Sequence, residues 1–245
     1  MTKIDLNADL GEGLDDAALL PFLSSCNVAC GLHAGGPAIM DTTVLLALGR
    51  GVHVGAHPGY ADRENFGRSE VQLTPDALRS LVLYQLGALD ALVRARGAAL
   101  THVKAHGALY NRAGRDRVLA RAFAQAVREF RADITLVGLA GSVQIEEARA
   151  AGLPSAGEAF ADRRYLPDGS LVPRAQPGAV LHDPAEAAEQ ALRIVRDGSV
   201  IASDGSRLAV DAQTLCLHGD TPGADRIAGA IRGALERAGV EIAPL

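Results

Sequence analysis

Short apolar runs alternate along the whole chain with longer stretches in which apolar residues recur every three or four positions. Runs of the first kind are typical of buried β-strands and stretches of the second kind of amphipathic helices, so the pattern indicates an α/β fold. Seven runs are predicted to be strands: 4–9, 26–31, 52–56, 101–105, 134–138, 155–159 and 214–218.

The clearest predicted helix starts after Thr74, which suits the N-cap, with Pro75 as the first helical residue. Its apolar period continues to about Arg96, and Gly97 ends it. Similar periodic stretches predict four more helices, at roughly 115–130, 142–151, 184–197 and 222–238.

Two segments, 60–73 and 160–181, have weak periodicity and are rich in Gly, Pro, Arg and Asp. Irregular segments of this length in a compact domain usually act as lids or binding loops. A third segment, 199–211, is expected to form a small hairpin around Asp204 and Gly205.

The composition allows a large core, with 245 residues, 48% hydrophobic content and a mean hydropathy of +0.11. Because α/β barrels of this length routinely form one domain, we expect residues 1–245 to form one α/β domain. The net charge is -5 and the basic residues are scattered, so no continuous track for phosphate backbones exists and we expect no nucleic-acid partner.

The N-terminal segment carries acidic residues where a signal peptide needs an apolar core. No apolar run approaches the roughly 18 residues of a membrane-spanning helix. We therefore expect a cytoplasmic protein with no membrane attachment. The odd number of cysteines, Cys26, Cys30 and Cys216, and their apolar surroundings indicate buried free thiols.

Four predicted strands end in a histidine near a glycine, within the segments 31–35, 56–59, 104–107 and 217–220. The carboxyl ends of parallel strands converge on the ligand site of α/β barrels, and glycine lets the backbone approach a bound group closely. The repetition therefore predicts a site that contains His33, His57, His106 and His218.

Lys104 is one of only two lysines, against 22 arginines, and stands between two histidines. Lysine, unlike arginine, shifts its pKa readily when buried. A chain that otherwise uses arginine is therefore expected to have a lysine where its chemistry needs a titratable cation. On a strand, His102, Lys104 and His106 share one face. His102 lies deeper and is expected to support the site, as is His53 on its own strand.

The first strand places Asp5, Asn7 and Asp9 on one face, pointing into the barrel. Asp5 and Asp9 are about 13 Å apart, too far to bind one atom, whereas Asn7 and Asp9 are about 6.6 Å apart and can share a ligand. Asp9 and Glu12 are therefore the better catalytic candidates. Asp5 belongs to the site or is a buried acid held by hydrogen bonds or an ion pair, with Lys104 as a candidate partner.

Asp220 follows His218 where a loop starts, which suits an exposed acid in the site or an N-cap for the stretch that begins at Pro222. The chain contains no phosphate loop, dinucleotide fingerprint, nucleophile elbow or His-Glu-x-x-His motif. It therefore offers no familiar nucleotide cradle, serine nucleophile or zincin site.

Six ordered blocks closely resemble the signatures of the 5-oxoprolinase A-subunit family, which is LamB/YcsF-like: 5–12, 27–35, 55–60, 103–111, 158–163 and 217–222. The resemblance runs nearly end to end and implies a seven-stranded, TIM-like (β/α) barrel of the glycoside hydrolase and deacetylase kind. It also implies ATP-dependent opening of 5-oxoproline (pyroglutamate) to L-glutamate, together with two partner subunits, B and C. Gly36 and Ala105 stand where the family usually has Asp and Pro, and Cys26 and Leu32 where it commonly has Ala and Phe.

The reaction that the resemblance implies gives the candidate residues their expected roles. Lys104 would stabilise developing negative charge, and Asp9 or Glu12 would be the general base for water. His33, His57 or His106 would protonate the ring nitrogen or bind the substrate carboxylate.

Six residues are expected to bind the substrate, with Arg163 as a bidentate clamp on its carboxylate: Asn7, His33, His57, Arg163, His218 and Asp220. Since the chain lacks a phosphate loop, ATP and a divalent metal that accompanies it are expected to be bound mainly by the partner subunits. No metal ligand is assigned in this chain.

Two alternatives remain open. In the first, the chain is an independent metal-dependent amidase or deacetylase with Asp9, His33 and His57 as ligands. In the second, it is a non-catalytic subunit that binds the lactam while the partners do the chemistry.

Overall fold

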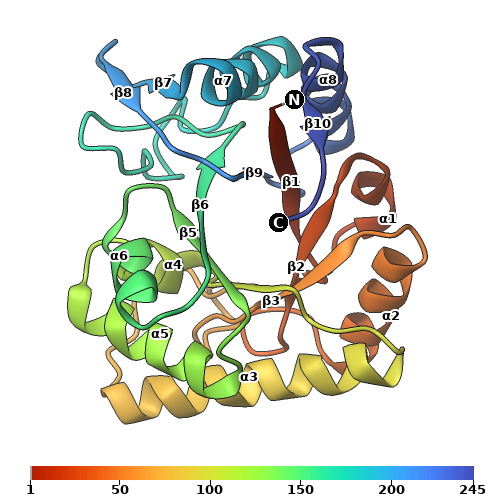
Figure 1. Cartoon of the computed structure of the whole chain (residues 1–245), viewed down its shortest axis with the longest axis vertical. Helices are drawn as coiled ribbons and strands as arrows, with labels where there is room; N and C mark the ends of the chain where they lie inside the picture. Colours follow the sequence, from red (N-terminus) through yellow and green to blue (C-terminus); the bar gives the residue numbers. More distant parts are fainter. Residues whose placement is uncertain (1) are drawn as a thin grey trace.

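Seven parallel strands close into a barrel in the computed structural model, which describes residues 2–245 (Figure 1). The strands are β1 (Lys3–Leu10), β2 (Ser25–Ala29), β3 (His53–His57), β4 (His102–Lys104), β5 (Thr135–Leu139), β6 (Ser155–Phe160) and β9 (Thr214–Leu217). Each pairs with the next in this order, and β9 closes the barrel by pairing with both β6 and β1. The seven predicted strands and the α/β class are confirmed.

Helices surround the barrel on its outside (Figure 1). They are α1 (Asp16–Leu19), the 3-10 turn η1 (Leu20–Phe22), α2 (Pro37–Leu48), α3 (Pro75–Ala95), α4 (Gly107–Ala113), α5 (Arg117–Phe130), α6 (Val143–Ala150), α7 (Pro184–Asp197) and α8 (Ala224–Arg237). Within residues 2–245, no helix combines the length and the apolar character needed to cross a membrane.

The five predicted helices are present, and α3 begins as its sequence indicates. The Thr74 side chain accepts a hydrogen bond of 3.2 Å from the Ala77 N–H, which satisfies one free donor of the first turn. The last helix differs from the prediction, because α8 starts at Ala224 with Gly223 at its N-cap and no capping side chain among the described residues. Asp220 is therefore not the cap of this helix.

Two small additions complete the sheet structure. The predicted hairpin forms from β7 (Ser199–Ile201) and β8 (Arg207–Ala209), which pair antiparallel. The short β10 (Glu241–Ile242) lies parallel to the start of β1 and was not predicted.

Alternation along β1 separates two environments. Leu6, Ala8 and Leu10 are buried in the apolar core with the side chains of the helices. Asp5, Asn7 and Asp9 point the other way, and their polar contacts join β1 to other barrel strands. The interior of this barrel is therefore lined by polar side chains where most barrels pack aliphatic ones.

Candidate active site

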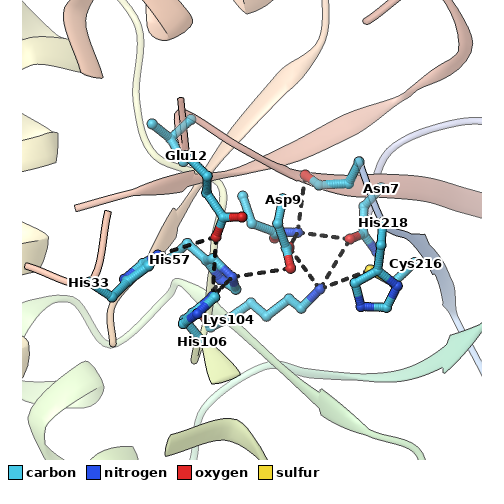
Figure 2. Close-up of polar contacts among 12 residues, drawn as sticks. Asn7, Asp9, Glu12, His33, His57, Lys104, His106, Cys216 and His218 are labelled. Carbon is cyan, nitrogen blue, oxygen red and sulfur yellow. Dashed lines mark hydrogen bonds and ion pairs between the residues drawn. The ribbon is translucent and has the colours of Figure 1, made fainter. Parts of the chain in front are cut away.

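Residues from the carboxyl ends of several strands meet at one end of the barrel (Figure 2). Glu12, His33, His57 and His106 gather on one side, and the Lys104 side chain extends to the other, toward Cys216 and His218. They come from β3, β4, β9 and the segments that follow β1, β2, β4 and β9. The predicted convergence of strand ends therefore occurs, and it includes all four histidines that follow strands.

The deepest polar layer is built around Asp5. Its carboxylate accepts hydrogen bonds from the Ser24, Ser25 and Thr214 hydroxyls at 2.7, 2.8 and 2.5 Å. Burial outweighs these bonds and raises the pKa of Asp5 above its ordinary value. Asp5 is thus a buried acid satisfied by hydroxyls, and Lys104 pairs with other carboxylates.

Two asparagines form the next layer. Asn27 donates to the side-chain oxygen of Asn7 at 2.7 Å and to Asp9 Oδ1 at 2.9 Å. His102 Nε2 donates to Asn27 Oδ1 at 2.8 Å, and burial lowers the pKa of His102 to about 3, so this ring is neutral. His102 thus positions Asn27, which agrees with the supporting role predicted for it.

Lys104 is fixed between two carboxylates. Its Nζ lies 3.0 Å from Asp9 Oδ1, 2.9 Å from Glu158 Oε1 and 3.1 Å from Cys216 Sγ. Burial alone would lower the pKa of Lys104, but the charges of Asp9 and Glu158 raise it well above its ordinary value. The amine is therefore a charged ammonium, and it orients both acids.

Glu158 was not among the predicted site residues, although its block contributed to the family resemblance. It is fully buried in β6, and its Oε1 accepts from Lys104 and from Asn7 Nδ2 at 3.1 Å. A single acid within the apolar run 155–159 could have marked Glu158 as a site residue, because a buried carboxylate needs a partner. The sequence did not reveal which residue that partner is.

Two imidazoles contact Glu12, and a third lies beside them. Its Oε1 lies 3.2 Å from both His33 Nε2 and His106 Nδ1. The His33 and His106 rings stack with centroids 3.8 Å apart, and His57 lies edge-on to both. His57 Nε2 is 3.2 Å from Asp9 Oδ2, so this histidine links the Glu12 group to the Lys104 group.

The ionisation of this group follows from its burial and its partners. Burial lowers the pKa of His33 to about 4, so the ring is neutral and its Nε2–H donates to Glu12. Burial would raise the pKa of Glu12, but its close contacts with the His106 and His33 rings bring it to about 2. At neutral pH Glu12 is a carboxylate whose neighbours are imidazoles.

The predicted loop 60–73 covers the histidines. The Phe66 carbonyl accepts from His106 Nε2 at 2.8 Å, and Phe66 has a φ of 56°, a strained value for a side-chain-bearing residue. Gly67 follows with a φ of +66°, and a Cβ there would lie 2.8 Å from His33 Cβ. This loop therefore fixes the rings closely.

On the far side of Lys104, His218 is oriented by Asp162. Its Nδ1 and its backbone N–H bond the Asp162 carboxylate at 3.0 Å each, and its ring stacks on Phe160. Burial would raise the pKa of Asp162, but His218 and Arg163 bring it below its ordinary value. Asp162 is a further residue that the sequence reasoning did not select.

Two predicted substrate-binding residues have protein partners. The Asp220 carboxylate pairs with Arg68 at 2.8 Å and with Arg174. The buried Arg163 donates from Nη2 to the Val172 carbonyl at 2.7 Å and from Nε to the Ala179 carbonyl at 3.3 Å, within the loop 160–181. These two bonds hold the loop in place, and the clamp on the substrate carboxylate stays a prediction.

Three sets of side chains place possible metal-ligand atoms within 4.8 Å of one another: Asp9, His57 and His106; Glu12, His33 and His106; and Asp9, Cys216 and His218. The metal-dependent alternative named Asp9, His33 and His57 as ligands. In the structure, Asp9 and His57 group with His106 rather than with His33. In the last set, Lys104 Nζ already contacts both Asp9 and Cys216, so a cationic group is present there.

The family model described as the LamB/YcsF family matches residues 4–245. A protein of Methylococcus capsulatus, named as the A subunit of 5-oxoprolinase, is 51% identical over 248 aligned residues, covering 99% of this chain and 95% of that protein. The crystal structure of a lactam utilization protein from Thermus thermophilus has a TM-score of 0.94 at 50% identity, covering 99% of this chain and 100% of that one.

A more distant structure bears on the fold alone. A T48 deacetylase, solved with substrate, has a TM-score of 0.52 at 15% identity and covers 98% of this chain and 87% of that one. The predicted deacetylase-like barrel is confirmed by this match.

Proposed function

The chain belongs to the LamB/YcsF family, and on that premise we propose that it is the A subunit of a 5-oxoprolinase, which opens 5-oxoproline to L-glutamate with ATP and two partner subunits. The support is the 51% identity over nearly the full length of proteins that carry this name. The likeness to a lactam utilization protein agrees, since 5-oxoproline is a five-membered lactam.

The chemistry of the substrate explains the need for ATP. A five-membered lactam is an unreactive amide, and transfer of a phosphoryl group to its carbonyl oxygen creates a leaving group. Water then adds to the carbonyl carbon, the ring C–N bond breaks and the nitrogen takes up a proton, which leaves an acyl phosphate. A second water hydrolyses this acyl phosphate to phosphate and the carboxylate of glutamate. Since this chain has no phosphate loop, subunits B and C bind ATP and its divalent metal.

The barrel end binds the lactam or its phosphorylated form and completes ring opening. Glu12 is the better base for water, because Asp9 is already paired with Lys104. The ammonium of Lys104 supplies fixed positive charge and positions Asp9, and His33, His57 or His106 delivers a proton to the ring nitrogen. The single observation that carries this assignment is the convergence of Glu12, three imidazoles and the Lys104 ion pairs at one barrel end (Figure 2).

The test is glutamate formation from 5-oxoproline by the purified chain, with and without ATP and the two partner subunits. The proposal expects turnover only when all three chains and ATP are present. Because ATP is the co-substrate, we expect the complex to work in the cytoplasm. Ring opening by this chain alone, without ATP, would instead support an independent amidase, and unchanged kcat in a Glu12→Gln variant would support a lactam-binding subunit.

A further inference from the structure

Backbone carbonyls fix the proton positions of two histidines in the site. His57 Nδ1 lies 2.9 Å from the Lys104 carbonyl, and His106 Nε2 lies 2.8 Å from the Phe66 carbonyl. A carbonyl oxygen only accepts, so each of these nitrogens carries the hydrogen. In the neutral rings, His57 Nε2 and His106 Nδ1 are therefore the nitrogens with lone pairs.

These two lone pairs face each other and two carboxylates (Figure 2). His57 Nε2 is 3.0 Å from His106 Nδ1 and 3.2 Å from Asp9 Oδ2. His106 Nδ1 is also 3.2 Å from Glu12 Oε1. Four acceptor atoms thus converge, with no donor of the described residues between them, and only a cation or an added proton makes this arrangement favourable.

We propose that Asp9 Oδ2, His57 Nε2 and His106 Nδ1 bind one divalent transition-metal ion, with Glu12 beside it. Ligands about 2.1 Å from one ion are roughly 3.0 to 3.4 Å apart at the angles of four- to six-coordinate sites. The measured separations of 3.0 and 3.2 Å fall in this range. Two imidazoles with a carboxylate are a donor set that zinc and similar ions prefer.

The outer contacts support the same assignment. Histidine ligands usually donate their second ring N–H to a carbonyl or carboxylate, and both His57 and His106 do so. Asp9 divides its oxygens, since Oδ1 accepts from Lys104 and Asn27 while Oδ2 faces His57. The side chain of Asp9 is 14% exposed, whereas Glu158 deeper in the barrel is fully buried, so the proposed site lies at the accessible end.

We infer the bound cation from this geometry alone. The role of the cation in the reaction rests in addition on the proposed function. In a site that opens a lactam, the ion would act as a Lewis acid next to Glu12. His57 and His106 are then ligands rather than proton donors to the ring nitrogen, and His33 is the remaining histidine of the three.

The experiment measures metal binding in the tag-free chain, without partners or ATP. The chain is stripped with a chelator, loaded with Zn²⁺ or Co²⁺, and analysed for metal stoichiometry and for the d–d absorption of Co²⁺. We expect about one ion per chain and an anomalous-scattering peak among Asp9, His57 and His106. His57→Gln and His106→Gln should weaken the Kd by at least about 100-fold, since even outer partners change metal affinity by about 10- to 100-fold.

His53→Gln is the matched control, because His53 is an exposed histidine on the same strand as His57. It should bind metal as the unchanged chain does, and circular dichroism should show that all variants are folded. The proposal is overturned if the chain binds no ion above the level of nonspecific sites, or if the scattering peak lies elsewhere. In that case a shared proton joins the rings of His57 and His106. The metal readout needs neither lactam nor ATP. A bound ion together with no 5-oxoproline turnover by the complete complex with ATP would therefore overturn the proposed function and not this site.

Discussion

At the scale of single residues, Lys104 shows how a buried cation organises its surroundings. It joins the acids of β1 and β6, and its carbonyl fixes the ring of His57. The rarity of lysine marked Lys104 as a candidate, and the alternation along the strand predicted that it shares one face with His102 and His106. They could not identify Glu158 as its partner, because that pairing joins residues distant in the chain.

Replacing Lys104 with methionine should destabilise the chain strongly. Lys104→Met leaves Asp9 and Glu158 buried without a counter-ion, and breaking a buried pair in this way costs about 3 to 5 kcal/mol. Urea unfolding followed by circular dichroism measures the change. Lys3→Met removes the only other lysine, which is exposed, and should have little effect. Equal stability of the two variants would contradict the ion-pair account.

Asp162 gives a pH-dependent prediction. Its pKa is lower in the folded chain than the ordinary 3.8, with His218 and Arg163 facing it, so it stabilises the fold above about pH 4. That stabilisation is lost as the pH falls through the lowered pKa. Asp162→Asn should therefore lower the free energy of unfolding by about 1 to 3 kcal/mol at pH 7 and by progressively less below pH 4. The measurement is urea unfolding at each pH, and a loss that stays constant down to pH 3 would show that the charge of Asp162 does not matter.

At the scale of elements, strands and long amphipathic helices were predictable because local periodicity defines them. α2 was not predicted as a range, since apolar residues such as Ile39 and Leu45 lie on its exposed side as well as its buried one. α4 contains only seven residues and follows β4 almost directly, which leaves little pattern to read. The loop 60–73 was correctly noted as irregular, but its carbonyl contact to His106 depends on the fold of Phe66 and Gly67.

Gly67 makes the contribution of this loop testable. In Gly67→Ala, the new Cβ would lie 2.8 Å from His33 Cβ and 2.9 Å from His106 Cδ2, so the loop or the rings must move. Displacements of about 1 Å in a site can lower turnover about 100-fold, and we expect at least a tenfold fall in kcat of the reconstituted complex.

Gly51→Ala is the control for backbone strain, because Gly51 has a similar φ of +69° and nothing within 4 Å of an added Cβ. It should lose some stability and keep its kcat. Equal kcat in the two variants would mean that the packing of loop 60–73 on the histidines is not needed for turnover.

At the scale of the whole molecule, the closed barrel explains why residues spread from 9 to 218 act together. Parallel pairing from β1 round to β9 brings every strand end to one side, which the histidine pattern predicted. The family resemblance supplied the closure of the barrel and the reaction. Asn27 and Asp162 were missed because their importance depends on cross-strand contacts that no local pattern records.

The most direct test of the account is the kcat of glutamate formation by the complex that contains a Glu12→Gln chain, with ATP and 5-oxoproline saturating. The amide keeps the shape of Glu12 and removes its ability to take a proton from water, so we expect kcat to fall by about 100-fold or more. Glu241→Gln, at an exposed position, should leave kcat unchanged. A folded Glu12→Gln chain that turns over within about twofold of the unchanged complex would contradict the assignment of this barrel end as the active site.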